Sequence, residues 1–419
     1  MAKWLEYYNP KPLIERLNKV RSINENGQVQ FRGFEESIVP ARLDSMVQLT
    51  GKIPEDEKYS IVKEAVWRAA KKKITRDNLL KELCRLESEY LKAPKKKYVL
   101  LTSLSIGQSR HKLKNVQENR CRITFGRCLP LRFAKARKQA IDDFPFLSKG
   151  INFPRGYLLV RVSVSDKTIE GGAAKALASL NLIRGLLNLA RNLRYGYTAS
   201  LVGKRKPINK ILLGSLHTLH KPNGEIAVDG VWHNGYSQEM PRLYNPSLGG
   251  EFVEVLEFAK NTRECLKKCR YRDCLVEAIV RYNSALDKDN WETSYIELWG
   301  VLEYLTNTLN DSYKTTIRRV SFIYEDQDGA KQTLSLLRDF RNKLVHRGTS
   351  TKTIEVFIFD LKRYVEQLLL FLIFNKFRFR SLEVAASFLD QSRDIDVIYR
   401  QIDVLKAAKN FVRTIPNKK

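Results

Sequence analysis

The C-terminal half of the chain is organised around one stretch, Leu337-Arg338-Asp339-Phe340-Arg341-Asn342-Lys343-Leu344-Val345-His346-Arg347-Gly348. Apolar residues recur here and just upstream at steps of three and four, namely Leu334, Leu336, Leu337, Phe340, Leu344 and Val345. This spacing predicts a helix with one buried side. Because helices often stop just before a glycine, Gly348 places His346 and Arg347 in the last turn. The stretch therefore predicts helix packing as the basis of this half of the fold.

Three polar residues stand near the end of this predicted helix: Arg341, Asn342 and His346. Asn342 and His346 are four residues apart and share a face, whereas Arg341 projects about 100° away from Asn342. The three side chains line one broad edge, but a single helix does not wrap them around a substrate. A second wall must come from another helix or another subunit.

These residue types suit cleavage of RNA without a metal. A histidine, whose pKa is ordinarily near about 6.5, takes the proton from a ribose 2′-hydroxyl or gives one to the leaving oxygen, which makes His346 the predicted general acid or base. Arg341 is the predicted phosphate clamp and Asn342 the positioning group, with Lys343 as an electrostatic helper. The expected products carry a 2′,3′-cyclic phosphate and a 5′-hydroxyl, and no cofactor is expected.

The same residues also allow a purely structural explanation. Cations are favoured near helix C-termini, so a capping histidine and a solvated arginine would account for His346 and Arg341 without any chemistry. Short motifs of this kind arise often by chance. The residues of the helix alone leave both explanations open.

Upstream segments extend the pattern: Arg281-Tyr282-Asn283-Ser284-Ala285-Leu286, Leu298-Trp299-Gly300-Val301-Leu302-Glu303-Tyr304-Leu305 and Ile317-Arg318-Arg319-Val320. Read with them, Arg341, Asn342 and His346 resemble the signature of the HEPN superfamily, an arginine, four to six intervening residues and a histidine, commonly with a polar residue straight after the arginine. The order of segments over residues 250–378 resembles the Apea-like branch. That branch tends to place glycine directly after the histidine, and here Arg347 intervenes.

The resemblance implies an all-helical domain that dimerises, so that two motif helices form one composite cleft. It also implies metal-independent endoribonuclease activity, often in anti-phage defence or toxin systems, although some members only bind. Glu303 is a weaker supporting candidate, since polar residues on the corresponding helix of relatives orient the motif. Glu303 can equally pair with Arg319 or face water.

Composition and charge point to a polyanionic partner. The 419-residue chain carries 74 Lys and Arg against 46 Asp and Glu, a net charge of +28, and 43% of its residues are hydrophobic. This balance is typical of a globular protein that binds nucleic acid, with RNA or DNA as the first candidate. The start of the chain has no apolar signal segment, and the most apolar run, residues 368–374, is too short to span a bilayer. We expect a cytoplasmic protein without a membrane partner.

The N-terminal half shows mixed patterns. Residues 28–39 are strand-like, and residues 61–70 and 77–91 have helical spacing. Strands are predicted at 98–106, 122–125, 157–164, 210–219 and 225–233, the last two joined across Pro222-Asn223-Gly224. Asp166 or Thr168 is the predicted cap of a long helix over residues 172–193. Eight further helices are predicted at 251–269, 273–287, 292–309, 313–324, 331–346, 353–377, 381–389 and 395–411.

Basic residues interleaved with aromatic residues predict an RNA-binding patch in this half of the chain. The candidates are Arg110, Arg122, Arg127, Arg194, Lys204 and Arg205, with Arg120, Arg132, Arg191 and Tyr195 among their neighbours. Solvated surface charge is the alternative for each of them. His217, His220 and His233 lie close in sequence, but His217 and His220 would point to opposite faces of a strand, so packing or RNA contact is favoured over a metal site. The six cysteines lack paired zinc spacing and are expected to be buried thiols.

The sequence thus predicts an α+β protein with two domains. Residues 1–248 form a basic mixed α/β domain that recognises RNA or senses a trigger, for which a phage-derived molecule is the family-level candidate, and residues 249–419 form an all-α HEPN helical bundle. The first functional hypothesis is a dimeric endoribonuclease. The alternative is a non-catalytic module whose motif helix binds RNA or a partner protein.

Overall fold

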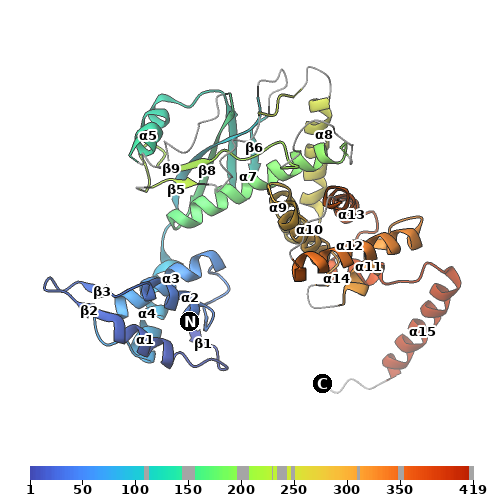
Figure 1. Ribbon diagram of the computed structural model, residues 1–419. Helices are drawn as coiled ribbons and strands as arrows, with labels where there is room; N and C mark the ends of the chain where they lie inside the picture. The colour runs from blue at the N-terminus through green and yellow to red at the C-terminus, as the bar shows by residue number, and fades with distance from the viewer. Residues whose placement is uncertain are drawn as a thin grey trace.

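The computed structural model describes residues 1–107, 113–143, 156–195, 207–228, 230–233, 243–246, 251–308, 312–347 and 353–414, and the side chains of Asp56, His233, His346, Arg347 and Thr414 lie outside this description. The protein has the predicted α+β class: a mixed region of strands and helices precedes an entirely helical region (Figure 1). Two large buried clusters hold the described chain together, one formed within residues 2–86 and the other by residues between 98 and 389.

The N-terminal cluster is built mainly from helices. Its elements are β1 (Lys3–Trp4), α1 (Lys11–Val20), β2 (Arg21–Ile23), β3 (Val29–Phe31), α2 (Glu35–Asp44), β4 (Val47–Gln48), α3 (Glu55–Ala69) and α4 (Arg76–Lys92). Thr75 caps α4 in a capping box, in which the hydroxyl of Thr75 accepts from the backbone of Asn78 and the Asn78 side chain accepts in return. The prediction of a strand over residues 28–39 is wrong beyond Phe31, because α2 begins at Glu35 and packs on α3.

A six-stranded sheet forms the centre of the molecule, with strand order β10-β9-β5-β8-β7-β6. Its strands are β5 (Lys96–Leu104), β6 (Val116–Glu118), β7 (Cys121–Gly126), β8 (Leu158–Asp166), β9 (Leu216–His220) and β10 (Trp232–His233), and neighbouring strands pair antiparallel. β9 and β10 pair across the predicted turn, where Gly224 has a φ of +104° that suits only glycine well. The predicted strands at 98–106, 122–125 and 157–164 are confirmed, and those at 210–219 and 225–233 are shorter than expected.

Two helices cover opposite faces of this sheet (Figure 1). On one face, α7 (Ile169–Asn192) packs its Ala, Leu and Ile residues against the strands, and Thr168 caps it by accepting from the backbone N–H of Gly171 at 3.0 Å. On the other face, α5 (Leu131–Asp142) packs Phe133 against Val99 and Leu101. α5 lies over β5 and β9, and among the described residues no helix packs on the same face of β7 and β8.

The C-terminal helices follow the predicted order closely. They are α8 (Glu251–Lys268), α9 (Arg272–Leu286), α10 (Trp291–Leu305), α11 (Tyr313–Ser321), α12 (Gln327–Arg347), α13 (Ile354–Phe374), α14 (Leu382–Leu389) and α15 (Ile395–Thr414). α10 packs between α9 and α13, and α12 contacts α10, α11 and α13. α15 stands away from the other helices (Figure 1), and its residues through Arg413 are exposed except for the half-buried Val397 and Ile398.

Buried polar contacts join the sheet layer to the helical region. Arg184 of α7 forms an ion pair with Asp287 at 2.7 Å, and the amide of Asn188 donates to Asn283 at 2.9 Å. Lys362 and Glu366 of α13 form a second buried pair at 2.9 Å, and the Lys362 ammonium also donates to the carbonyl of Asn192. Helix α7 therefore serves both the sheet and the helices, which share one hydrophobic cluster. The division at residues 248 and 249 stays a prediction about domains.

Candidate functional site

Helix α12 carries the predicted catalytic residues, and its buried stripe fixes it against α10. Leu334, Leu337, Phe340 and Leu344 are buried as the spacing predicts, whereas Leu336 and Val345 of the same predicted stripe are exposed. The hydroxyl of Tyr295 on α10 donates to the carbonyl of Leu337 at 2.8 Å, and the rings of Tyr295 and Phe340 lie 5.2 Å apart, edge to face. These contacts hold the last two turns of α12 in one orientation.

Arg341 is half-buried beside Asn342 and over an aromatic ring. Its guanidinium carbon lies 5.3 Å from the centre of the Tyr313 ring, and its Nη1 donates to Asn342 Oδ1 at 3.3 Å. Its Nε is buried and has no hydrogen-bond partner among the described residues. No carboxylate in the described chain pairs with this guanidinium. A partly buried guanidinium that is held on a ring and has no carboxylate partner can bind an anion from outside.

Glu303 does not contact Arg341 directly. It accepts a hydrogen bond from the indole Nε1 of Trp299 at 2.8 Å, and the Trp299 ring lies 6.2 Å from that of Tyr313. Arg319, the other suggested partner of Glu303, pairs with Asp390 at 2.6 Å instead. Glu303 is therefore linked to Arg341 indirectly, through the rings of Trp299 and Tyr313. The helical spacing did not indicate this arrangement.

The other motif residues are placed less completely. Lys343 lies exposed on α12. The backbone of His346 belongs to α12, four residues beyond Asn342, and its side chain lies outside the described residues. Tyr313 and Trp299 are the contacts that sequence reasoning missed. The one available signal was Ser312, a typical helix cap that places Tyr313 at the first position of α11.

The predicted RNA-binding residues do not form one patch in the described chain. Arg127 donates to backbone carbonyls, at 3.1 Å for Gly156, and so ties two loops together. Arg194 forms an ion pair with Glu254 of α8. Arg122 lies on β7 of the sheet, opposite Ser163 of β8. Arg110, Lys204 and Arg205 lie outside the described residues.

Arg122 belongs instead to a pocket beside α5, on the face of the sheet that α5 packs against. The pocket has a volume of about 350 Å³ and is lined by Val99, Arg122, Thr124, Arg132, Phe133, Arg161, Ser163 and Pro222. Arg161 had not been singled out from the sequence. The available signal was the alternation Arg161-Val162-Ser163-Val164, in which one residue in two is polar.

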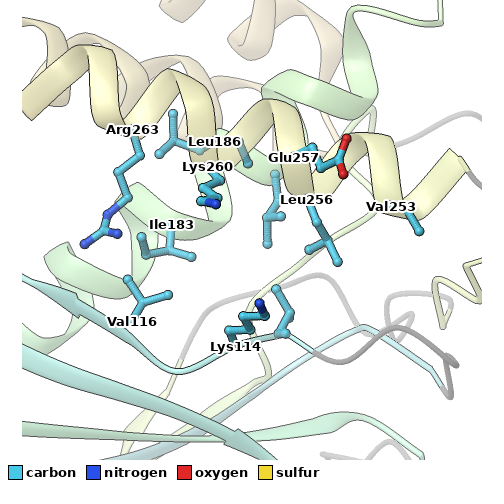
Figure 2. A pocket seen from close by; sticks show the side chains of 12 residues that line it. Lys114, Val116, Ile183, Leu186, Val253, Leu256, Glu257, Lys260 and Arg263 are labelled. Carbon is cyan, nitrogen blue, oxygen red and sulfur yellow. The ribbon is translucent and has the colours of Figure 1, made fainter.

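A larger cavity of about 630 Å³ lies between β6, α7 and α8 (Figure 2). Its walls are aliphatic, and Lys260 on α8 and Lys114 before β6 come from opposite sides of it, with Glu257 nearby. Arg263 on its border is already engaged in an ion pair with Glu118 at 2.7 Å. The cavity has the size and composition of an apolar ligand site but brings together no reactive groups.

The described histidines of the sheet serve packing and hydrogen bonding. His217 Nδ1 lies 2.7 Å from the hydroxyl of Thr102, whereas His220 contacts the Phe133 ring on the α5 face, so the two point to opposite faces as predicted. Within the described residues, no three His, Cys, Asp or Glu side chains gather as metal ligands would. The cysteines are all free thiols; Cys121 and Cys269 are buried, but Cys128 is exposed, contrary to the expectation.

Comparisons with known proteins give no match: no protein-family model, no curated protein and no solved structure is significantly similar to this chain. The resemblance to HEPN domains therefore rests on the order and spacing of the quoted segments. In the described part of the chain, no helix is both long enough and apolar enough to cross a membrane.

Proposed function

We propose that the protein is a metal-independent endoribonuclease whose reacting groups lie at the end of α12. The observation that carries the proposal is Arg341, a half-buried guanidinium supported by Tyr313 and Asn342 and lacking a carboxylate partner in the described chain. Folded proteins rarely leave a partly buried charge without a counter-ion unless a ligand supplies it. A phosphodiester is a ligand of the required sign and geometry.

The reaction uses the RNA's own nucleophile. A base removes the proton of the ribose 2′-hydroxyl, the oxygen attacks the adjacent phosphorus, and the bond to the 5′-oxygen breaks as that oxygen accepts a proton. Arg341 binds the phosphate as charge accumulates on it, and Asn342 positions the reacting oxygens. His346, on the same face as Asn342 by helical spacing, is the general acid or base, and Lys343 adds positive potential.

We propose that a second subunit forms the other wall of the substrate cleft. Val345 is 46% exposed and lies one turn from Arg341 and Asn342 on α12, so an apolar residue borders the site. A partner helix from a second copy would cover it and complete the cleft, as the resemblance implies. The resemblance also favours a role in anti-phage defence or as a toxin in the cytoplasm, with tRNA among the candidate substrates and a phage-derived trigger.

Cleavage is tested by sequencing RNA ends that bear 5′-hydroxyls after incubation of purified protein with cellular RNA in chelator. We expect wild type to produce new ends, and His346→Ala and Arg341→Ala to reduce them by about 100-fold or more. Arg338→Ala is the matched control, because Arg338 lies on the same helix and already pairs with Asp339 at 2.7 Å. Undiminished cutting by either motif variant, or cutting that chelator abolishes, would overturn the proposal.

Two substitutions of Tyr313 test whether its ring supports the guanidinium of Arg341 or only fills space in the packing. Tyr313→Phe keeps the ring under the guanidinium and should retain activity, whereas Tyr313→Leu removes the ring and should reduce cleavage by roughly 2- to 10-fold. If wild-type protein binds RNA but does not cleave it, even in cells challenged with phage, this result would instead support a non-catalytic binding module.

A further inference from the structure

We propose that the arginine pocket on the sheet binds a terminal phosphate group, either of a free nucleotide or of a 5′-phosphorylated RNA end. The pocket lies on the sheet, remote in sequence from α12, and binding of phosphate there does not depend on RNA cleavage. Four of its polar residues come from β7 and β8, and one comes from α5.

Strand register brings the polar residues together. Arg122 lies opposite Ser163, and Thr124 lies opposite Arg161. Residues on one face of neighbouring antiparallel strands are directly opposed or diagonal, and diagonal neighbours lie about 7–8 Å apart. Arg122 and Arg161 are such a diagonal pair, so their side chains share the α5 face of the sheet, beside the helix.

The start of α5 adds the third guanidinium. Phe133 is buried against Val99 and Leu101 and fixes the helix on the sheet. Arg132, next to it, lines the pocket, with its guanidinium carbon 5.1 Å from the Phe133 ring centre. The turn at Gly224 packs closely against Arg132: a Cβ on Gly224 would lie 3.0 Å from side-chain and backbone atoms of Arg132. Arg132 is thus held in place from two sides.

The positive charges that line the pocket favour an anionic ligand. In the described chain, none of the three guanidinium groups forms an ion pair, whereas Arg263 and Arg272 elsewhere share the carboxylate of Glu118. Three like charges around one depression repel each other, and a dianionic phosphate would relieve this repulsion through bidentate hydrogen bonds. Ser163 is exposed and adds a hydroxyl donor.

The size of the pocket favours a phosphate end over a length of duplex. A volume of about 350 Å³ is near the lower limit for small-molecule sites, which accommodates one or two phosphate groups with part of a sugar. The floor is formed by Val99 and Phe133, both buried, so no exposed ring is present for base stacking. The pocket is therefore expected to bind the phosphate group without distinguishing one base from another.

The test measures binding to the full-length protein by calorimetry. The probes are pyrophosphate, ADP, and a short 2′-O-methyl oligonucleotide with either a 5′-phosphate or a 5′-hydroxyl, which no 2′-hydroxyl mechanism can cleave. We expect Arg161→Gln and Arg122→Gln each to weaken binding of the phosphate-bearing ligand by about tenfold. The control is Arg76→Gln, an equal charge change at an exposed position at the start of α4, with an expected effect below about twofold.

The probes distinguish the two sources of phosphate. A preference for the 5′-phosphorylated oligonucleotide that Arg161→Gln removes assigns the site to RNA ends, whereas tight binding of ADP with no such preference assigns it to free nucleotide. If no probe binds, or if the two pocket variants and Arg76→Gln weaken binding equally while all three keep the wild-type melting temperature, the proposal is wrong. Loss of RNA cleavage in a separate assay would not alter this result.

Discussion

Arginine side chains in this molecule divide into two groups by their partners. Several hold the fold together through carboxylates, as Arg184 does with Asp287. Others, including Arg122, Arg161 and Arg341, have no acidic partner in the described chain. A chain with 74 basic and 46 acidic residues must leave some cations unpaired. The informative point is that these unpaired cations are partly buried or clustered, where a missing counter-ion costs more than on an open surface.

A second feature at residue scale is a chain of hydrogen bonds through His220. Arg137 donates to the hydroxyl of Thr218 at 2.8 Å, which lies 2.9 Å from His220 Nε2, and His220 Nδ1 lies 2.9 Å from the carbonyl of Gly224. The arrangement assigns a neutral ring that donates from Nδ1 and accepts at Nε2. Burial, together with the charge of Arg137, lowers the pKa of His220 below its usual 6.5.

This lowered pKa predicts a loss of stability in mild acid. A depressed folded-state pKa contributes stability that is present above the unfolded value of about 6.5 and is lost as the pH falls through the folded value, at about 1.4 kcal/mol for each unit of difference. His220→Gln, which does not titrate, should flatten the dependence of the free energy of unfolding on pH between 7 and 5. Urea unfolding at both pH values measures this, and equal slopes for variant and wild type would refute it.

At the scale of elements, the contact between α10 and α12 decides where the motif lies. The Tyr295 hydroxyl reaches the carbonyl of Leu337 in the middle of α12, in addition to the bonds within the helix. Because this hydroxyl is buried, it has no water to replace the partner. The position of Arg341 and Asn342, one turn further along α12, depends on this anchor.

Tyr295→Phe should therefore lower the free energy of unfolding by about 1 kcal/mol, the usual value of one buried hydrogen bond. Tyr324→Phe is the matched control, since the Tyr324 hydroxyl is buried and has no hydrogen-bond partner in the described chain, and its removal should cost nothing measurable. Chemical unfolding of both variants decides the point. An equal loss in the two would show that the Tyr295 hydroxyl does not anchor α12.

At the scale of the whole molecule, two hydrophobic clusters divide the chain near β5. The N-terminal helices form one, and the sheet and C-terminal helices share the other. The contacts between them include Lys167, whose ammonium donates to the carbonyl of Tyr90 at 2.7 Å, and Thr168, whose hydroxyl donates to Glu57. Polar contacts of this kind couple two bodies less strongly than a shared apolar core.

The clusters should therefore respond separately to core mutations. Leu83→Ala, at a fully buried position of α4, should destabilise by about 2–5 kcal/mol and reduce hydrogen-exchange protection in residues 1–92 while β5 and β8 stay protected. Leu180→Ala, at an equally buried position of α7, should instead reduce protection in both the sheet and the C-terminal helices. Loss of protection throughout the molecule after Leu83→Ala would show a single cooperative unit.

Much of the secondary structure was predictable from the sequence, because burial of one side leaves a local period in most elements, the largely exposed α15 being the exception. The eight C-terminal helices, the strands around Leu100, Ile123 and Val162, and the cap at Thr168 are present as predicted. The strand predicted over residues 28–39 failed beyond Phe31, where Pro40 inside a short helix gave no clear period.

Only the tertiary structure decided which charged side chains have partners. Arg122 and Arg127 looked alike in sequence, yet Arg127 is occupied by backbone carbonyls and Arg122 shares a pocket with Arg161, from a different strand. Likewise, Arg341 depends on Tyr313, which lies on another helix. Periodicity is a property of neighbouring residues and is visible locally, whereas the partner of a charge depends on strand register and helix packing, which the whole chain sets together.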